Sequence, residues 1–175
     1  MQDRICTPKT FRNHPAQWEL QRLLQQLFKT PDPRRITREV VDYLQHHPLP
    51  ADDFPFIRST YTRSILLRAK NRFEGMAARW SSKSVSVIHG HPSFTLYYVV
   101  FGHLACDNYT RRGSGVKKIT STALTAGEFT AFTGPPGTFD NHIHQVTAME
   151  ETLSIHVSSD DAAKGEIFFP ERTVQ

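Results

Sequence analysis

The part of the chain that decides the fold is residues 84–104, which read SVSVIHGHPSFTLYYVVFGHL. Two runs rich in β-branched and aromatic residues, 84–89 and 95–104, stand on either side of a proline. Runs of this length, bounded by glycine or proline, are typical of β-strands. The stretch therefore predicts two strands, the first of which carries the pair His89 and His91.

Similar short runs follow the same pattern along the second part of the chain. We expect further strands at 64–68, 73–80, 117–124, 127–132, 142–148 and 153–157. Glycine and proline punctuate them, as in Gly113-Ser-Gly115 and Gly134-Pro-Pro-Gly137. Many short strands at this spacing indicate an all-β sandwich or barrel.

The first part of the chain has the period of a helix. Its apolar residues recur at helical spacing between 16 and 29, at Trp18, Leu20, Leu23, Leu24 and Leu27. A second helix is expected with Thr37 near its start, an apolar face that includes Val40, and an end at His46-His47-Pro48. Asp52 and Asp53 are interpreted as caps of a third short helical segment. We therefore predict one domain, with a helical section over 1–60 and a β-barrel over 61–175.

Composition excludes several classes of protein. The 175 residues contain no apolar run of about 18, so no membrane-spanning helix is expected. The N-terminus lacks an apolar stretch after its charges, and only two cysteines occur, so we expect no secretory signal, no disulfide framework and a cytoplasmic location. The net charge of +4 comes from scattered residues outside any nucleic-acid-binding motif, so no nucleic-acid partner is expected.

Two His-x-His segments are the most informative feature. A strand has a side-chain period of two, so His89 and His91 leave the same face, and so do His142 and His144. A small barrel can bring two such strands together across its interior, and three imidazoles then suit a transition metal. On spacing alone, either His142 or His144 can be the third ligand.

These segments resemble the sequence motifs of a known family. His89-Gly-His91 with Gly102 resembles the first cupin motif without its glutamate, and the segment from Gly127 to His144 resembles a loose second cupin motif. The fold implied is a mainly β, cupin-type small β-barrel, or jelly roll, with a helical N-terminal section.

More specifically, residues 61–158 resemble cysteine dioxygenase and its thiol dioxygenase relatives. The segments that carry the resemblance are Tyr61-Thr62-Arg63 followed 26 residues later by His89, then His144-Gln145-Val146 and Ser154-Ile155-His156. The family implies Fe(II) held by His89, His91 and His144, a thiol substrate on the metal and O2 as co-substrate. It also implies that Arg63 binds the substrate carboxylate, with Tyr61 nearby and His156 oriented by Ser154.

The sequence departs from this family on the oxygen side of the site. Ser158 stands where the family has a tyrosine, and Thr95 or Leu96 stands where some members have a cross-linking cysteine. The loop between His91 and Gly102 is also one residue shorter. If the alternation runs from His91 without a bulge, Tyr97 faces inward and offers a phenol from another strand, although it can equally fill the core.

We therefore expect an iron-dependent oxygenase that acts on the sulfur of cysteine or a related small-molecule thiol, as a monomer or homodimer. One alternative is a diverged member that rearranges or cleaves the oxidised cysteine, for example to a sulfonamide in natural-product biosynthesis. The other is a metal-binding cupin without redox chemistry, with an isomerase between the two.

Overall fold

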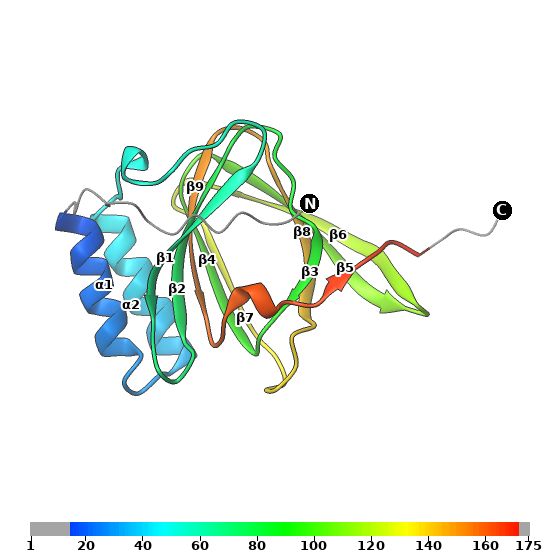
Figure 1. Ribbon diagram of the computed structural model, residues 1–175, viewed down its shortest axis with the longest axis horizontal. Coiled ribbons are helices and arrows are strands. Elements are labelled where there is room, and N and C mark those ends of the chain that lie inside the picture. The colour runs from blue at the N-terminus through cyan, green and yellow to red at the C-terminus, as the bar shows by residue number, and fades with distance from the viewer. Residues whose placement is uncertain (1–14, 172–175) are drawn as a thin grey trace.

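The computed structural model describes residues 15–171, where the strands form two antiparallel sheets of five strands each. The first sheet has the order β1 (Tyr61–Arg68), β2 (Glu74–Trp80), β9 (Thr152–Ser158), β4 (Phe94–Phe101) and β7 (Phe129–Thr133). The second has the order β10 (Ile167–Phe168), β3 (Ile88–His91), β8 (Asn141–Ala148), β5 (His103–Arg112) and β6 (Gly115–Thr125). The sheets face one another, and the β5–β6 hairpin extends away from the helices (Figure 1). This confirms the predicted mainly β jelly roll.

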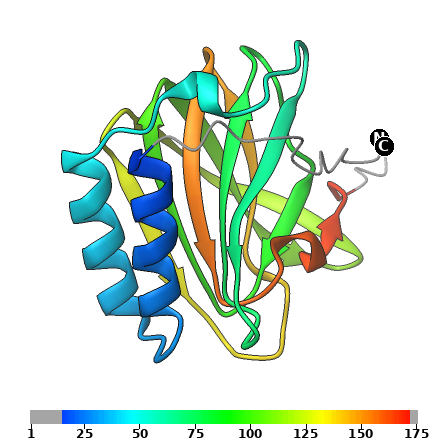
Figure 2. The same ribbon diagram turned by 60° about the vertical axis from the view of Figure 1, so that its left-hand side comes forward.

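Two helices cover the outer face of the first sheet (Figures 1 and 2). They are α1 (Pro15–Leu27) and α2 (Pro33–His46). One core cluster joins the apolar faces of both helices to the outward side chains of β4 and β9: Leu20, Leu24, Leu27, Ile36, Val40, Leu44, Leu96, Ile155 and Val157. Gly75 on β2 allows the close approach, because a Cβ there would lie 2.5 Å from Leu24 Cδ1.

The helices differ from the sequence prediction in three details. Trp18, which was assigned to the apolar face, is 53% exposed and stacks with the Arg22 guanidinium at 4.7 Å. The second helix begins at Pro33, four residues before Thr37, because Asp32 accepts a hydrogen bond of 2.8 Å from the Arg34 amide and caps it. Asp52 and Asp53 do not cap the third segment but lie within it, a 3-10 helix over Ala51–Asp53.

The strands differ in three places, one of which is β10, for which no strand was predicted. Residues 84–87 are irregular apart from an isolated bridge between Val85 and Thr147, and the strand begins only at Ile88. The third difference is β5: the predicted strand over 95–104 ran through Gly102 into its first two residues, and 105–112 was left unassigned because polar residues occupy much of that stretch. No helix among residues 15–171 is both long enough and apolar enough to cross a membrane.

Strand β9 shows how the fold builds an interior site. All seven of its residues are buried. Leu153, Ile155 and Val157 pack towards the helices, whereas His156 and Ser158 line the cavity between the sheets. Strict alternation along one central strand thus separates an apolar core from a polar interior.

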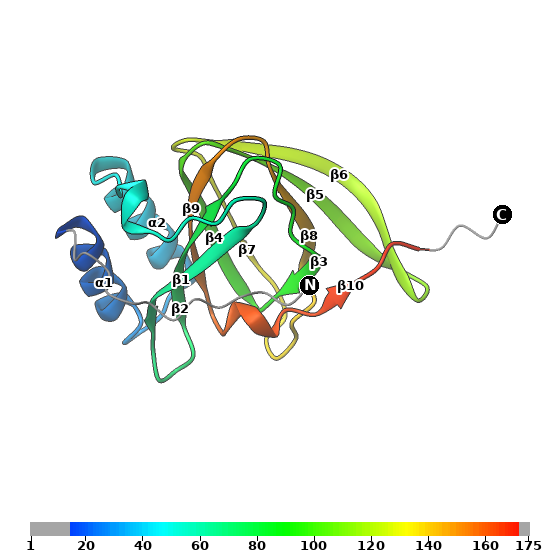
Figure 3. The same ribbon diagram turned by 45° about the horizontal axis from the view of Figure 1, so that its top comes forward.

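The C-terminal segment closes one side of this interior. After β9 the chain forms a 3-10 helix over Ala162–Lys164, and β10 then pairs with β3, with Ile167 opposite His89. Figure 3 shows this segment crossing from the first sheet to the second. Ala162, Ala163 and Gly165 line the cavity that it covers.

Candidate metal centre

Three histidines from two neighbouring strands lie together inside the barrel. His89 and His91 come from β3 and His144 from β8, with His89 directly opposite His144 in the register. One ligand atom from each lies within 4.8 Å of the others, and the Nε2 atoms of His91 and His144 are 3.0 Å apart. Side chains with this spacing can share a single metal ion.

The glycine between His89 and His91 is required by its surroundings. A Cβ on Gly90 would lie 2.5 Å from both the Phe139 carbonyl oxygen and the Asp140 Cα. The Gly90 amide also donates to the Glu166 carbonyl at 2.8 Å, which ties β3 to the C-terminal segment. The His-Gly-His sequence therefore lets a tightly packed strand direct two imidazoles to one side.

His142 lies beside the three histidines but outside the group. The register between β3 and β8 shifts between His89 and His91, and His142 has a φ of 45°, in the left-handed region. Its ring stacks on Phe132, with centroids 3.9 Å apart. This bulge breaks the strict alternation that made His142 and His144 equivalent on spacing alone.

The hydrogen bonds and the charge state of the histidines suit metal binding. His89 Nδ1 lies 2.9 Å from the Val87 carbonyl, which can only accept, so Nδ1 carries the proton and Nε2 keeps its lone pair. Burial, reinforced by the neighbouring histidines, holds the pKa of His91 and of His144 well below 6.5. Both rings are therefore neutral near pH 7 and can donate lone pairs.

The other side chains of the cavity also bear on whether a metal fits. Asp and Glu are absent from the described residues that line the cavity, so the side-chain donors are imidazole nitrogens, hydroxyl groups and the Met76 thioether. Such a set accommodates iron, copper, nickel or zinc.

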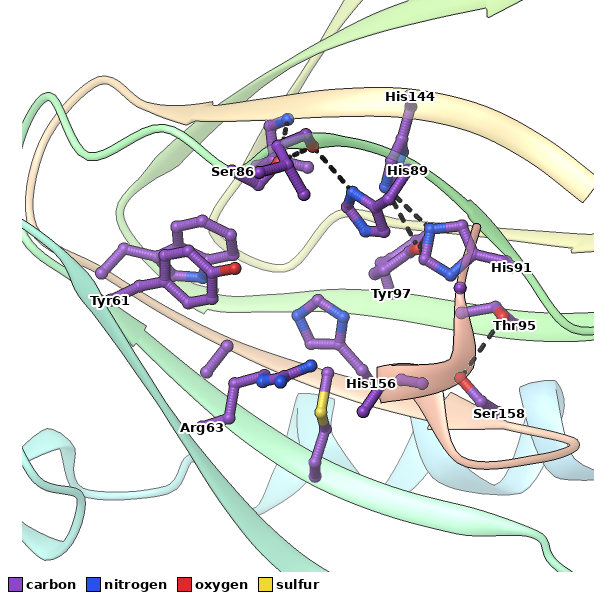
Figure 4. Close-up of a pocket in the computed structure, with 18 of the residues that line it drawn as sticks. Tyr61, Arg63, Ser86, His89, His91, Thr95, Tyr97, His144, His156 and Ser158 are labelled. Carbon is purple, nitrogen blue, oxygen red and sulfur yellow. Dashed lines mark hydrogen bonds between the residues drawn. The ribbon is translucent and has the colours of Figure 1, made fainter. Parts of the chain in front are cut away.

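Arg63 and Tyr61 on β1 line the same cavity, whose volume is about 70 Å³. In Figure 4, His156 lies between Arg63 and the three histidines. The Tyr61 ring stacks on Trp80, with centroids 4.2 Å apart. The structure thus brings the residues of the predicted substrate side and those of the predicted metal side into one cavity.

His156 is held by a hydrogen-bonded chain. The Trp80 indole donates to Ser154 Oγ at 2.9 Å, and Ser154 Oγ lies 2.8 Å from His156 Nε2. Since Ser154 accepts from Trp80, its own proton is available for Nε2. Burial, with added repulsion from His89 and Arg63, lowers the pKa of His156 to about 3, so this ring is also neutral.

Ser158 and Thr95 form the wall where the family that the sequence resembles has a phenol and, in some members, a thioether. Their hydroxyl oxygens are 3.3 Å apart, and both side chains are buried. Thr95 Oγ1 donates to the Phe94 carbonyl at 2.8 Å, so Ser158 is the donor between the two hydroxyls. Two small hydroxyl groups therefore replace a bulky aromatic wall.

Tyr97 on β4 brings a phenol into the histidine group. Its hydroxyl lies 2.6 Å from His91 Nε2 and 3.3 Å from His144 Nε2, and its ring meets His156 edge-on at 4.6 Å. Burial raises the pKa of Tyr97 well above 10, so the phenol is protonated when no cation is nearby.

Some lining residues were not found from the sequence. Met76 and Trp80 on β2 line the cavity, as do Ala162, Ala163 and Gly165 of the C-terminal segment. Trp80 could have been predicted, because it is an aromatic residue with a hydrogen-bond donor at the end of an apolar run in the sequence. The small residues of the C-terminal segment carry none, because their role depends on how the segment folds back over β3.

Comparison with known proteins identifies the fold. No protein-family model matches the sequence, and no curated protein matches it. A conserved protein with a double-stranded β-helix domain from Klebsiella pneumoniae superposes with a TM-score of 0.50 at 18% identity, covering 69% of this chain and 96% of that one. A cupin superfamily protein from Desulfitobacterium hafniense gives a TM-score of 0.49 at 13% identity, covering 65% of this chain and 91% of that one. The chain therefore has a double-stranded β-helix, or jelly-roll, fold.

Proposed function

We propose that this protein is a mononuclear iron oxygenase that adds O2 to the sulfur of cysteine or of a closely related thiol amino acid. The observation that carries the proposal is that three imidazoles and a guanidinium line one cavity of about 70 Å³. The resemblance of residues 61–158 to thiol dioxygenases supports the same reading. A small cavity also favours a small substrate over a polymer or a sugar chain.

Arg63 and His156 would hold the organic part of the substrate. Arginine keeps its charge at all working pH values, and its planar guanidinium donates two parallel hydrogen bonds to a carboxylate. His156, fixed by Ser154, is neutral and offers a hydrogen-bonding group that adds no charge between Arg63 and a cation. A thiol at the other end of the substrate would then face His89, His91 and His144.

Bound iron would supply the position where thiolate and O2 meet and exchange electrons. The net reaction, RSH + O2 → RSO2H, balances without an added reductant, since both oxygen atoms end on sulfur. The protein's contribution is to orient the substrate and to exclude water. The C-terminal residues Ala162, Ala163 and Gly165, which line the cavity, serve the second purpose.

The wall formed by Thr95 and Ser158 favours a second outcome at the same site. It provides short hydroxyl groups and no phenol, so the oxidised substrate has more space and a different hydrogen-bonding partner on that side. A rearranged or cleaved oxidation product of cysteine is therefore the second candidate.

The test is oxygen consumption by the protein loaded with Fe(II) when cysteine is added under 18O2, with mass spectrometry of the product. We expect O2 uptake that depends on iron and on cysteine, and two labelled oxygen atoms in a sulfinate. A rearranged product that contains label would favour the second candidate. Full iron occupancy with no uptake on cysteine, cysteamine or 3-mercaptopropionate would contradict both and favour a metal-binding cupin without redox chemistry.

A further inference from the structure

Strand β7 is an edge strand without the usual protection against pairing with a further strand. Within residues 15–171 it pairs only with β4, and its sequence, Phe-Thr-Ala-Phe-Thr, contains no charge, proline or glycine. The other edge strands are protected by a charge and a register shift (Arg68 on β1), by charges alone (Lys117 and Lys118 on β6) or by short length (β10). Proteins use these devices to prevent association of sheet edges, so their absence from β7 points to a partner there.

The backbone of β7 offers hydrogen-bonding groups at three positions. Its even-numbered neighbours bond to β4, as the hydrogen bond of 2.7 Å from the Gly134 amide to the Ser93 carbonyl shows. In an antiparallel ladder, the residues between them direct N–H and C=O away from that neighbour. Phe129, Ala131 and Thr133 therefore present these groups along the open edge of the first sheet.

An apolar groove of about 760 Å³ follows the same edge, between β7 and α2. Helix α2 runs along this strand (Figure 2). Phe94, Phe129 and Ala131 belong to the lining, and Phe129 is 44% exposed. A partner strand at the edge would cover this apolar surface while it satisfied the free backbone groups.

The charges on the α2 side of the groove favour a second copy of this chain as the partner. Arg34 and Arg38 line the first half of the helix, and Asp42 lines the second half. The side chains of Arg38 and Asp42 are 74% and 76% exposed. A two-fold axis reverses the direction of the helix, so the basic half of one copy would face the acidic half of the other. An acidic peptide would complement only the basic half.

The geometry of the edge permits this symmetry. If two β7 strands pair antiparallel about Ala131, Phe129 of each copy lies opposite Thr133 of the other, and all three free positions find partners. Helix α2 contacts both β4 and β7. The two copies of α2 would therefore lie about two strand spacings apart, or about 10 Å, which is the distance of packed helices.

We infer that the protein forms a two-fold symmetric dimer in which two β7 strands pair antiparallel and join the first sheets of both copies into one continuous sheet. The two α2 helices pack side by side over the joint and bury the groove. This interface is separate from the proposed metal site, so the inference does not depend on the proposed function.

The first test is the mass of the full chain in solution, by light scattering coupled to size-exclusion chromatography. We expect twice the chain mass of 20.0 kDa for the wild type. Phe129→Lys places a charge on the edge and should give a monomer with an unchanged melting temperature. Ile119→Lys is the matched control, because Ile119 is an exposed apolar residue on another edge strand, β6, and this variant should remain a dimer.

A charge exchange tests the two-fold arrangement. We expect Arg38→Glu to raise the dissociation constant of the dimer at least about tenfold, because like charges then meet at two symmetric positions. The double variant Arg38→Glu with Asp42→Arg should restore most of the affinity. A double variant that dimerises no better than Arg38→Glu would overturn this packing of α2 against α2.

Hydrogen exchange locates the interface. The amides of Phe129, Ala131 and Thr133 should exchange slowly in the wild type and rapidly in Phe129→Lys, since only a partner strand protects them. A wild type that remains monomeric at millimolar concentration would overturn the inference and leave the β7 edge to a different protein. A dimer that persists in Phe129→Lys, with these amides still exchanging rapidly, would also overturn it by placing the interface elsewhere.

Discussion

Replacement of Arg63 is the most specific test of how the protein recognises its substrate. Replacing Arg63 with alanine removes the cation that would bind the substrate carboxylate but leaves the three histidines untouched. Truncating one partner of a desolvated charge pair typically costs 2–5 kcal/mol. Arg63 is half-buried at the edge of the cavity, so we expect the lower part of that range, about 2–3 kcal/mol. This corresponds to a loss of about 30- to 150-fold in kcat/KM for cysteine.

The assay compares three thiols on wild type and Arg63→Ala by initial rates of O2 uptake. Cysteine and 3-mercaptopropionate carry the carboxylate, whereas cysteamine lacks it. We expect the two carboxylates to lose the full factor and cysteamine to change by less than about threefold, since its binding never used the charge pair. An equal loss on all three thiols would refute the reasoning and assign Arg63 to the support of the fold. Iron content measured on the same samples separates substrate binding from metal loss.

Two further predictions concern the altered wall and the buried histidines. Ser158→Tyr should raise the share of sulfinate among the products if the phenol ring fits beside Thr95, and an unchanged product distribution, measured by mass spectrometry, would mean that this wall does not steer the reaction. In the metal-free protein, burial lowers the pKa of His142 to about 4 and that of His156 to about 3, both below the ordinary 6.5. Between these values the unfolded chain binds more protons than the folded protein does. The free energy of unfolding should therefore fall as the pH is lowered from about 6.5 towards 4. Each such histidine contributes at most about 1.4 kcal/mol per pH unit to this dependence. His156→Gln should reduce the slope of the free energy of unfolding against pH, measured by urea unfolding. An unchanged slope would contradict the lowered pKa of His156.

The sequence was informative wherever a strand kept its alternation. The spacing of His89 and His91 sufficed to predict that both imidazoles leave one face, because Gly90 keeps the strand extended and tightly packed. The apolar run over 153–157 likewise predicted β9, whose alternate residues face the helices and the cavity. These features follow from local geometry, which a single sequence records well.

Features that depend on irregular backbone or on packing between distant segments could not be predicted from the sequence. The choice between His142 and His144 depends on a bulge with a φ of 45°, and nothing in the spacing of the two residues encodes it. Most of strand β5 was not predicted, because its polar positions, such as Asp107 and Asn108, interrupt the alternation that is typical of a half-buried strand. The lining by the C-terminal segment depends on its pairing with β3.

The contact between Tyr97 and His91 could be predicted from the sequence only in part. Parity predicted that Tyr97 faces inward, but the approach of its hydroxyl to within 2.6 Å of His91 Nε2 depends on how β4 of one sheet packs against β3 of the other. Such contacts between sheets are set by the whole barrel and by the volume of the other side chains inside it.

We propose that His89, His91 and His144 together hold one transition-metal ion. The most direct measurement is the iron content per chain, by elemental analysis after Fe(II) loading and desalting, of the wild type and four single histidine-to-alanine variants. We predict about one iron per chain in the wild type and in His142→Ala, whose imidazole stacks on Phe132 outside the group, and little iron in His89→Ala, His91→Ala or His144→Ala. Stoichiometric iron in folded His91→Ala or His144→Ala, or its loss from His142→Ala alone, would contradict the assignment of the metal centre.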